Sequence, residues 1–153
     1  MKKVFLIVLA MLMVFSTQSA FAQDDIRVTI EGVQIEFDVP PQIVEGRTLV
    51  PMRKIFEALG AKVTWVQEAQ MVIATYDTSI LTMEIGKDSF TVTDVVTEET
   101  KVVTLDVTSR VIDGRTLVPV RAISESAGRK VEWDNATRTV VIGTLEAFAE
   151  EIN

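Results

Sequence analysis

The feature that most constrains this chain is a phrase of twenty residues that occurs twice, 68 positions apart. GRTLVPMRKIFEALGAKVTW begins at Gly46 and GRTLVPVRAISESAGRKVEW begins at Gly114, and 13 of the 20 positions are identical. Two copies are too few for an open solenoid, which needs about three or more repeats. We therefore expect two half-domains, over about residues 26–85 and 89–143, that share one core.

Each copy of the phrase predicts a turn, a strand, a short helix and a further strand. The Glu-Gly or Asp-Gly pair at its start suits a turn with positive φ, and its proline suits the first position of a helix. From Met52 onward apolar residues recur at helical spacing, and Gly60 predicts the end of that helix. In the second copy Ser124 replaces Phe56, which predicts weaker packing of the second helix.

The rest of the chain predicts further strands. Apolar residues alternate on both sides of turn signals at residues 31–32, 67–69, 86–88 and 134–137, which indicates a series of hairpins. Residues 144–153 predict a C-terminal helix or tail, because four apolar residues from 145 to 152 line one helical face. We therefore predict an α+β fold, a mainly antiparallel curved sheet with two short helices, built from two pseudo-repeats that share one core.

The first 22 residues have the three parts of a secretory signal peptide. Two lysines precede an apolar run, and an Ala-Phe-Ala site ends at Ala22. The run is shorter than the ~20 residues that a membrane-spanning helix needs. We therefore expect export, cleavage after Ala22, and a secreted or cell-wall-associated chain over residues 23–153 with no membrane insertion.

Charge narrows the range of partners. Removal of Lys2 and Lys3 leaves 13 basic residues against 22 acidic ones, a net charge of −9. Such a chain is poorly matched to nucleic acid or to another strongly anionic polymer such as teichoic acid. We therefore exclude a nucleic-acid function and favour neutral glycan strands or an exported protein as the partner.

The duplicated phrase resembles the copper amine oxidase N-terminal-like domain, also called the stalk domain, of bacterial exported proteins. The similarity covers roughly residues 26–143. It implies an antiparallel sheet curved around short helices, in an accessory module often attached to wall-acting enzymes of Gram-positive bacteria. It implies no established ligand. Many members carry a further catalytic domain, which we do not expect in this chain, so we expect the module to act alone or through a partner.

The composition argues against catalysis. The chain has no histidine and no cysteine, so the nucleophile–histidine arrangements of hydrolases and the usual ligands of copper and zinc are absent. In amine oxidases the copper is held by histidines of a separate catalytic domain, beside a quinone made from a tyrosine. The one tyrosine here is Tyr76. We expect no catalytic residues, no cofactor, no metal site and no enzyme activity.

The repeated residues therefore have a structural interpretation and a functional one. The arginines of the duplicated phrase could hold neighbouring loops or recognise an acidic polymer. Arginine and glutamate four residues apart on each predicted helix could also form ion pairs. The tryptophans of the phrase could anchor the core or stack on sugars. We favour the structural interpretation for the arginines and for the tryptophans. The repeated residues are Gly46, Arg47, Pro51, Arg53, Glu57, Gly60 and Trp65 in the first copy, and Gly114, Arg115, Pro119, Arg121, Glu125, Gly128 and Trp133 in the second.

Two functions remain. The first is an exported, non-catalytic module of the cell envelope that binds a wall glycan or another exported protein. The alternative is a structural or assembly subunit that associates with its own copies through sheet edges.

Overall fold

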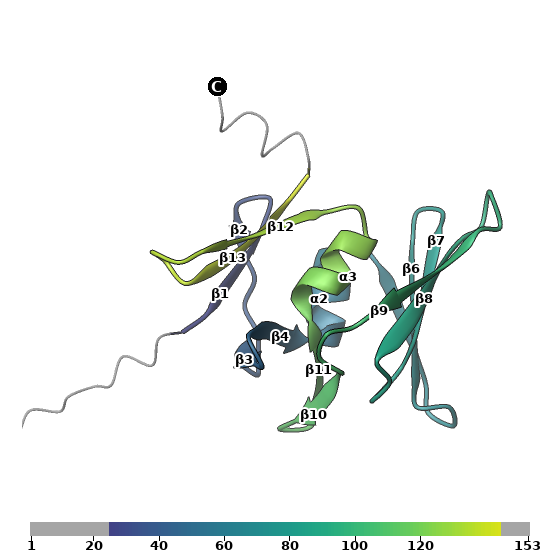
Figure 1. Ribbon diagram of the computed structural model, residues 1–153, viewed down its shortest axis with the longest axis horizontal. Coiled ribbons are helices and arrows are strands. Elements are labelled where there is room, and N and C mark those ends of the chain that lie inside the picture. The colour runs from purple at the N-terminus through teal and green to yellow at the C-terminus, as the bar shows by residue number, and fades with distance from the viewer. Residues whose placement is uncertain (1–24, 145–153) are drawn as a thin grey trace, which may run out of the picture.

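The computed structural model describes residues 25–144. Within them it has two short helices and thirteen strands (Figure 1). The predicted signal peptide lies outside this range, and so does the C-terminal helix or tail predicted over residues 144–153, except for Thr144. The elements are β1 (Arg27–Ile30), β2 (Val33–Gln34), β3 (Gln42–Val44), β4 (Arg47–Pro51), α2 (Met52–Ala58), β5 (Lys62–Val66), β6 (Met71–Tyr76), β7 (Ser79–Glu84), β8 (Ser89–Asp94), β9 (Thr100–Thr104), β10 (Arg110–Ile112), β11 (Arg115–Pro119), α3 (Val120–Ser126), β12 (Lys130–Asp134) and β13 (Thr139–Gly143).

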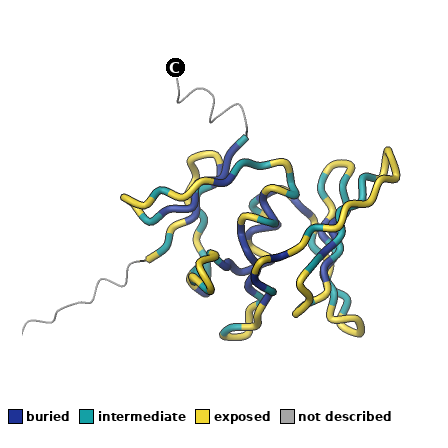
Figure 2. Tube along the Cα trace, viewed as in Figure 1, coloured by how far each residue is buried: buried dark blue, intermediate teal, exposed yellow. Residues whose placement is uncertain are grey.

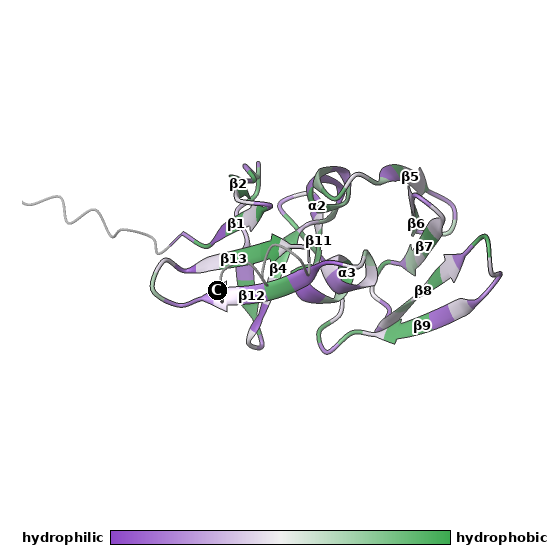
Figure 3. Ribbon diagram, turned by 90° about the horizontal axis from the view of Figure 1, so that it is seen from above, coloured by the Kyte–Doolittle hydropathy of each residue, from purple (hydrophilic) through white to green (hydrophobic). Residues whose placement is uncertain are grey.

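The strands form three sheets, and the two helices lie between the outer two (Figure 1). The strand orders are β12-β13-β1-β2, β10-β11-β4-β3 and β5-β6-β7-β8-β9. All described neighbours are antiparallel except β1 and β13, which pair in parallel. Seen from above, the five-stranded sheet curls from β5 round to β9 (Figure 3). The predicted α+β class with two short helices is confirmed, but the strands divide into three sheets where we predicted one.

The two copies use equivalent hairpins in different sheets. The β5–β6 hairpin of the first copy continues antiparallel into β7, the next strand of the chain. The β12–β13 hairpin of the second copy pairs instead with β1, which brings the first and last described strands together. The predicted hairpins are present, whereas the short edge strands β3 and β10 were not predicted.

The turns before the repeated strands are as predicted. Glu45 and Gly46 connect β3 to β4 with φ of 51° and 75°, and Asp113 and Gly114 connect β10 to β11 with φ of 48° and 72°. Positive φ at both central residues is what a type I′ hairpin turn requires. A glycine at the second of these positions adopts this conformation at no steric cost.

Both helices end in the same hydrogen-bonded cap. In α2, Gly60 has a φ of 87° and its N–H donates to the Glu57 carbonyl, while Ala61 donates to Phe56. These are the two bonds of the Schellman motif. The equivalent bonds from Gly128 and from the residue after it close α3.

The prolines of the repeat lie one position earlier than predicted. Pro51 is the last residue of β4 and the N-cap of α2, and Pro119 has the same place between β11 and α3. Each proline retains an extended ψ, of 116° and 112° respectively. The chain therefore passes from strand to helix without a loop, because proline's fixed φ suits both conformations.

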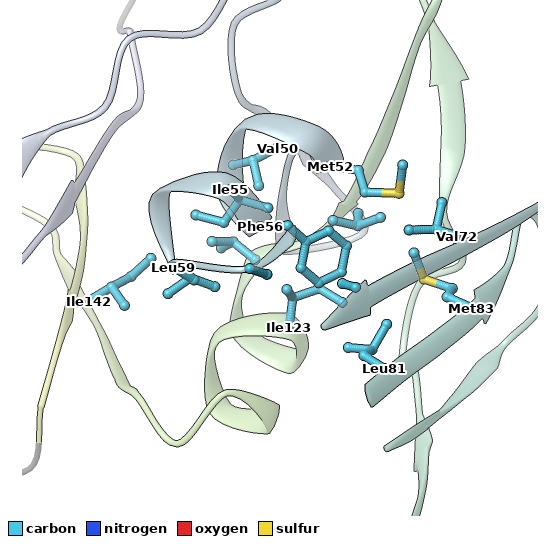
Figure 4. Close-up of a cluster of buried hydrophobic side chains, with 14 of the residues drawn as sticks. Val50, Met52, Ile55, Phe56, Leu59, Val72, Leu81, Met83, Ile123 and Ile142 are labelled. Carbon is cyan, nitrogen blue, oxygen red and sulfur yellow. The ribbon is translucent and has the colours of Figure 1, made fainter. Parts of the chain in front are cut away.

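One main core lies between the helices and the outer sheets (Figures 2 and 4). The predicted face of α2 is buried, and Phe56 lies at its centre among Val72, Leu81, Met83 and Ile123 (Figure 4). These neighbours come from both copies, so the two halves share this core as predicted.

The second helix departs from the first at Ser124. This residue has the position of Phe56 and is fully buried, yet its Oγ has no hydrogen-bond partner. The second helix thus buries a small polar side chain at the position where the first helix buries an aromatic ring.

A second, smaller core lies on the other face of the central sheet. Leu49 and Leu117 pack there with Val39 and Val107. Each residue has its equivalent 68 positions away, so this core is itself symmetric.

Candidate functional site: two clefts related by the repeat

The repeated strands β4 and β11 pair with each other at the centre of the molecule. Their antiparallel register places Val50 opposite Val118 and Leu49 opposite Pro119. Each residue of one copy therefore faces a residue of the other, and a local two-fold axis passes between Val50 and Val118. Contacts close to this axis therefore recur with the copies exchanged.

Two arginines of the repeat join the copies through reciprocal ion pairs. Arg47 donates from Nε and Nη2 to Oδ2 of Asp106 over 2.8 and 2.5 Å. Arg115 donates from Nε to Oδ2 of Asp38 over 2.6 Å. The hydrogen bond from Arg115 holds the pKa of Asp38 below its ordinary value of 3.8. Since all four side chains are exposed, these pairs fix the positions of the arginines more than they stabilise the fold.

A cleft of about 610 Å³ opens where the start of β11 meets the end of β4 and the start of α2. We name it the Trp65 cleft. Its walls therefore come from both copies: Gly114, Arg115 and Thr116 from the second, and Glu36, Asp38, Pro51, Met52, Arg53, Lys54, Glu57, Val63 and Trp65 from the first.

The opposite end of the same strand pair has an equivalent cleft of about 310 Å³, the Trp133 cleft. A pocket of about 420 Å³ adjoins it and shares Arg47, Asp106, Pro119 and Arg121 with it. The Trp133 cleft is lined by Gly46, Arg47, Thr48, Asp106, Pro119, Val120, Arg121, Val131, Glu132, Trp133 and Val140.

The Trp65 cleft combines an aromatic wall with polar side chains that have few partners. Trp65 packs partly against the main core, and its Nε1 donates to Gln67 Oε1 over 2.8 Å. Arg53 and Glu57 do not form the helical ion pair that their spacing allows, and neither do Arg121 and Glu125. The ion pairs of the described residues involve other side chains. An exposed pair of this kind gains little free energy, so these side chains remain available to a ligand.

The prediction that both tryptophans are core anchors is wrong for Trp133. The residue is 36% exposed, although Val131 on the same face of β12 is buried. Val140, which pairs with Trp133, is buried in the main core, whereas β12 is the edge strand of its sheet. Alternation identifies the apolar face of a strand, but it cannot say whether that strand lies at the edge of its sheet.

The two clefts are lined by residues that lie far apart in the sequence. Of the predicted repeat residues, the arginines, the tryptophans and Glu57 line the two clefts, and Glu125 lines the adjoining pocket. Gly60 and Gly128 only terminate helices. Glu36, Lys54 and the aspartates that pair with the repeat arginines were missed as cleft residues. The signal for Asp38 and Asp106 was present, because they are themselves 68 positions apart.

The chain matches a known protein family over most of its length. The model of the copper amine oxidase N-terminal domain matches residues 29–142, which contain both copies of the phrase and both clefts. The chain belongs to this family. The resemblance that the duplicated phrase indicated is thus confirmed. The copper amine oxidase N-terminal domain is a non-catalytic accessory domain. No curated protein matches the chain.

Over residues 25–144, no three or more aspartate or glutamate side chains come together to hold a metal ion. Neither of the helices described there is long and apolar enough to cross a membrane.

Proposed function

We propose that this chain is an exported, non-catalytic module of the cell envelope that binds a neutral glycan strand in the Trp65 cleft. The observation that carries this proposal is the indole of Trp65 in a cleft whose charges balance. Arg53, Lys54 and Arg115 oppose the three carboxylates of the lining.

A sugar ring suits such a cleft chemically. The apolar C–H face of a pyranose stacks on an indole. Its hydroxyl groups accept hydrogen bonds from arginine or lysine and donate hydrogen bonds to carboxylates. Arg53 and Glu57 provide a donor and an acceptor, respectively, that no described side chain occupies. The volume, about 610 Å³, falls in the range of sites for small ligands.

The charge balance supports a neutral ligand over an anionic one. The whole chain has a net charge of −7, which repels anionic polymers at low salt. A local surplus of cations would be needed to overcome that repulsion, and the lining of the Trp65 cleft has none.

Export rests on the first 22 residues, with their basic start, apolar run and Ala-Phe-Ala site. The non-catalytic role rests on the lack of histidine and cysteine in the whole chain and on the family to which the chain belongs. Together these observations support the proposal of a binding module at the cell surface.

The test is retention on purified wall sacculi, with and without teichoic acid. We expect retention on both, and we expect it to fall for Arg53→Gln and Glu57→Gln, which are exposed changes that leave the core intact. Val111→Thr is the matched control, since Val111 is exposed and lies outside both clefts. Retention that requires teichoic acid would refute the proposal. Retention of both cleft variants at the wild-type level would refute it as well.

The assembly alternative is favoured by one observation, the outer edge of β9. This strand ends the five-stranded sheet, and its Val102 is 64% exposed. An unpaired edge with an exposed apolar residue is suited to pairing with another chain, whether a second copy or an exported protein. Concentration-dependent oligomers in size-exclusion chromatography, abolished by Val102→Lys, would favour this function, and a monomer at all concentrations would exclude self-assembly.

A further inference from the structure

We infer that the Trp133 cleft is a second site for the same class of ligand, so that one chain binds two glycan strands. This inference rests on the proposed function. It adds a site in the second copy that neither the sequence pattern nor the family match assigns.

The first argument is the equivalence of the two linings. Nine residues of the Trp133 cleft have their counterparts, 68 positions away, in the Trp65 cleft. The two-fold relation between β4 and β11 explains this, because it exchanges the walls of the two clefts. The matched pairs are Gly46 with Gly114, Arg47 with Arg115, Thr48 with Thr116, Asp38 with Asp106, Pro51 with Pro119, Met52 with Val120, Arg53 with Arg121, Val63 with Val131, and Trp65 with Trp133.

The second argument is the state of the groups that would contact a sugar. Trp133 is 36% exposed, so part of its ring surface is open, whereas a core role would have buried it. Arg121 makes no ion pair in the described residues. The charges of the lining balance again, with Arg47 and Arg121 against Asp106 and Glu132. A neutral ring that stacks on an indole therefore suits both clefts.

The differences between the clefts predict a difference in affinity. Glu36 and Lys54 of the Trp65 cleft are replaced by Thr104 and Ala122, which lie in the adjoining pocket. Two charged contacts are therefore lost. The counterpart of Glu57, Glu125, also lies in this adjoining pocket and not in the Trp133 cleft. We expect the Trp133 cleft to bind the same glycan more weakly.

The geometry predicts that the two sites engage separate strands. One cleft lies where β4 ends and β11 begins, and the other where β11 ends and β4 begins. Five extended residues span about 13 Å between the first and last Cα, which is the length of β4 from Arg47 of the Trp133 cleft to Pro51 of the Trp65 cleft. A chain with one site at each end of the strand pair links two glycan strands, which multiplies its retention on a dense wall.

The experiment uses the fact that the protein has two tryptophans in all. Each gives one indole N–H signal in a nitrogen-15 spectrum, so each cleft has its own reporter. The ¹⁵N-labelled protein, in the form that the cell exports, is titrated with a hexamer of β-1,4-linked N-acetylglucosamine. Trp65→Phe and Trp133→Phe assign the two signals. We expect both signals to shift, with the Trp133 signal saturating at the higher ligand concentration.

Variants show whether each shift arises in its own cleft. Arg121→Gln is expected to weaken binding reported by Trp133 about tenfold, as loss of an anchor contact does, and to leave the Trp65 titration unchanged. Arg53→Gln is the matched variant with the opposite effect. If the Trp133 signal stays fixed while the Trp65 signal saturates, the second site is refuted and the proposed function remains. If neither signal moves, the proposed function itself fails.

A sandwich assay tests the linking of two strands. Wild-type protein is expected to capture a fluorescent hexamer on beads that carry the same glycan, because one cleft holds the bead and the other the hexamer. Arg53→Gln and Arg121→Gln should each lower capture about tenfold, whereas Val111→Thr should not. Capture by the Arg121→Gln variant at the wild-type level would overturn the inference.

Discussion

Val50 of β4 lies directly opposite Val118 of β11, its own counterpart 68 residues further along the chain. Because a residue that pairs with its own equivalent lies on a local symmetry axis, contacts close to that axis occur in exchanged pairs. The two arginine–aspartate ion pairs and the two clefts follow from this one register. Other registers would separate the arginines from the aspartates that hold them.

Phe56 is predicted to contribute far more to stability than Ser124, although the two have equivalent positions. Phe56→Ala should lower the free energy of unfolding by about 3–5 kcal/mol, since it empties the centre of the main core. Ser124→Ala should be neutral or stabilising, because it removes a buried hydroxyl that has no partner. Urea unfolding measures both. A loss of stability in Ser124→Ala similar to that in Phe56→Ala would contradict this account.

Gly60→Ala and Gly128→Ala should each lower the free energy of unfolding by about 1 kcal/mol, because a residue with a Cβ is strained at positive φ. The φ angles are 87° and 73°, and an added Cβ would meet no atom within 4 Å at either site. The cost is thus that of the backbone alone. Thermal unfolding of the two variants and of the double variant should give additive losses, since the caps close different helices. An unchanged melting temperature would show that these caps do not need a positive φ.

Asp38→Asn should change the pH dependence of stability. The pKa of Asp38 is lowered in the folded protein, chiefly by its hydrogen bond from Arg115, so the folded state binds this proton less readily than the unfolded state. The stabilising contribution is therefore complete above the ordinary pKa of about 4 and is lost as the pH falls through the lowered value. The stability difference between wild type and Asp38→Asn should thus be largest near neutral pH and vanish in strong acid. A difference that is constant from pH 7 to pH 2 would rule out this linkage.

Trp65→Ala is predicted to destabilise the fold more than Trp133→Ala. Trp65 packs partly against the main core, whereas Trp133 is 36% exposed and belongs to neither described core. We expect the Trp133→Ala loss to remain below the range of about 3–5 kcal/mol for a buried aromatic residue. If chemical unfolding shows that both variants lose the same free energy of unfolding, Trp133 has a structural role after all.

Local structure could be predicted where the physical cause is itself local. Asp113 and Gly114 predict a turn because glycine adopts positive φ without strain, and Met52 with Phe56 predicts a buried helical face from its spacing alone. The duplication likewise predicted two equivalent halves and one shared core. The family followed from the same residues.

The clefts could be found only in the tertiary structure. The sequence shows that Arg47 and Arg115 are equivalent, but not that each would meet the aspartate of the other copy, since that depends on the register of β4 against β11. Register is set by which apolar faces can be buried together, a property of the whole core. The exposure of Trp133 has a similar origin, because the place of β12 at the edge of its sheet depends on the pairing of β13 with β1. The sequence by itself determined the elements, their duplication and the chemistry available to the chain. The packing of the two copies decided which of those side chains line a cleft, because burial and proximity depend on residues far apart in the chain.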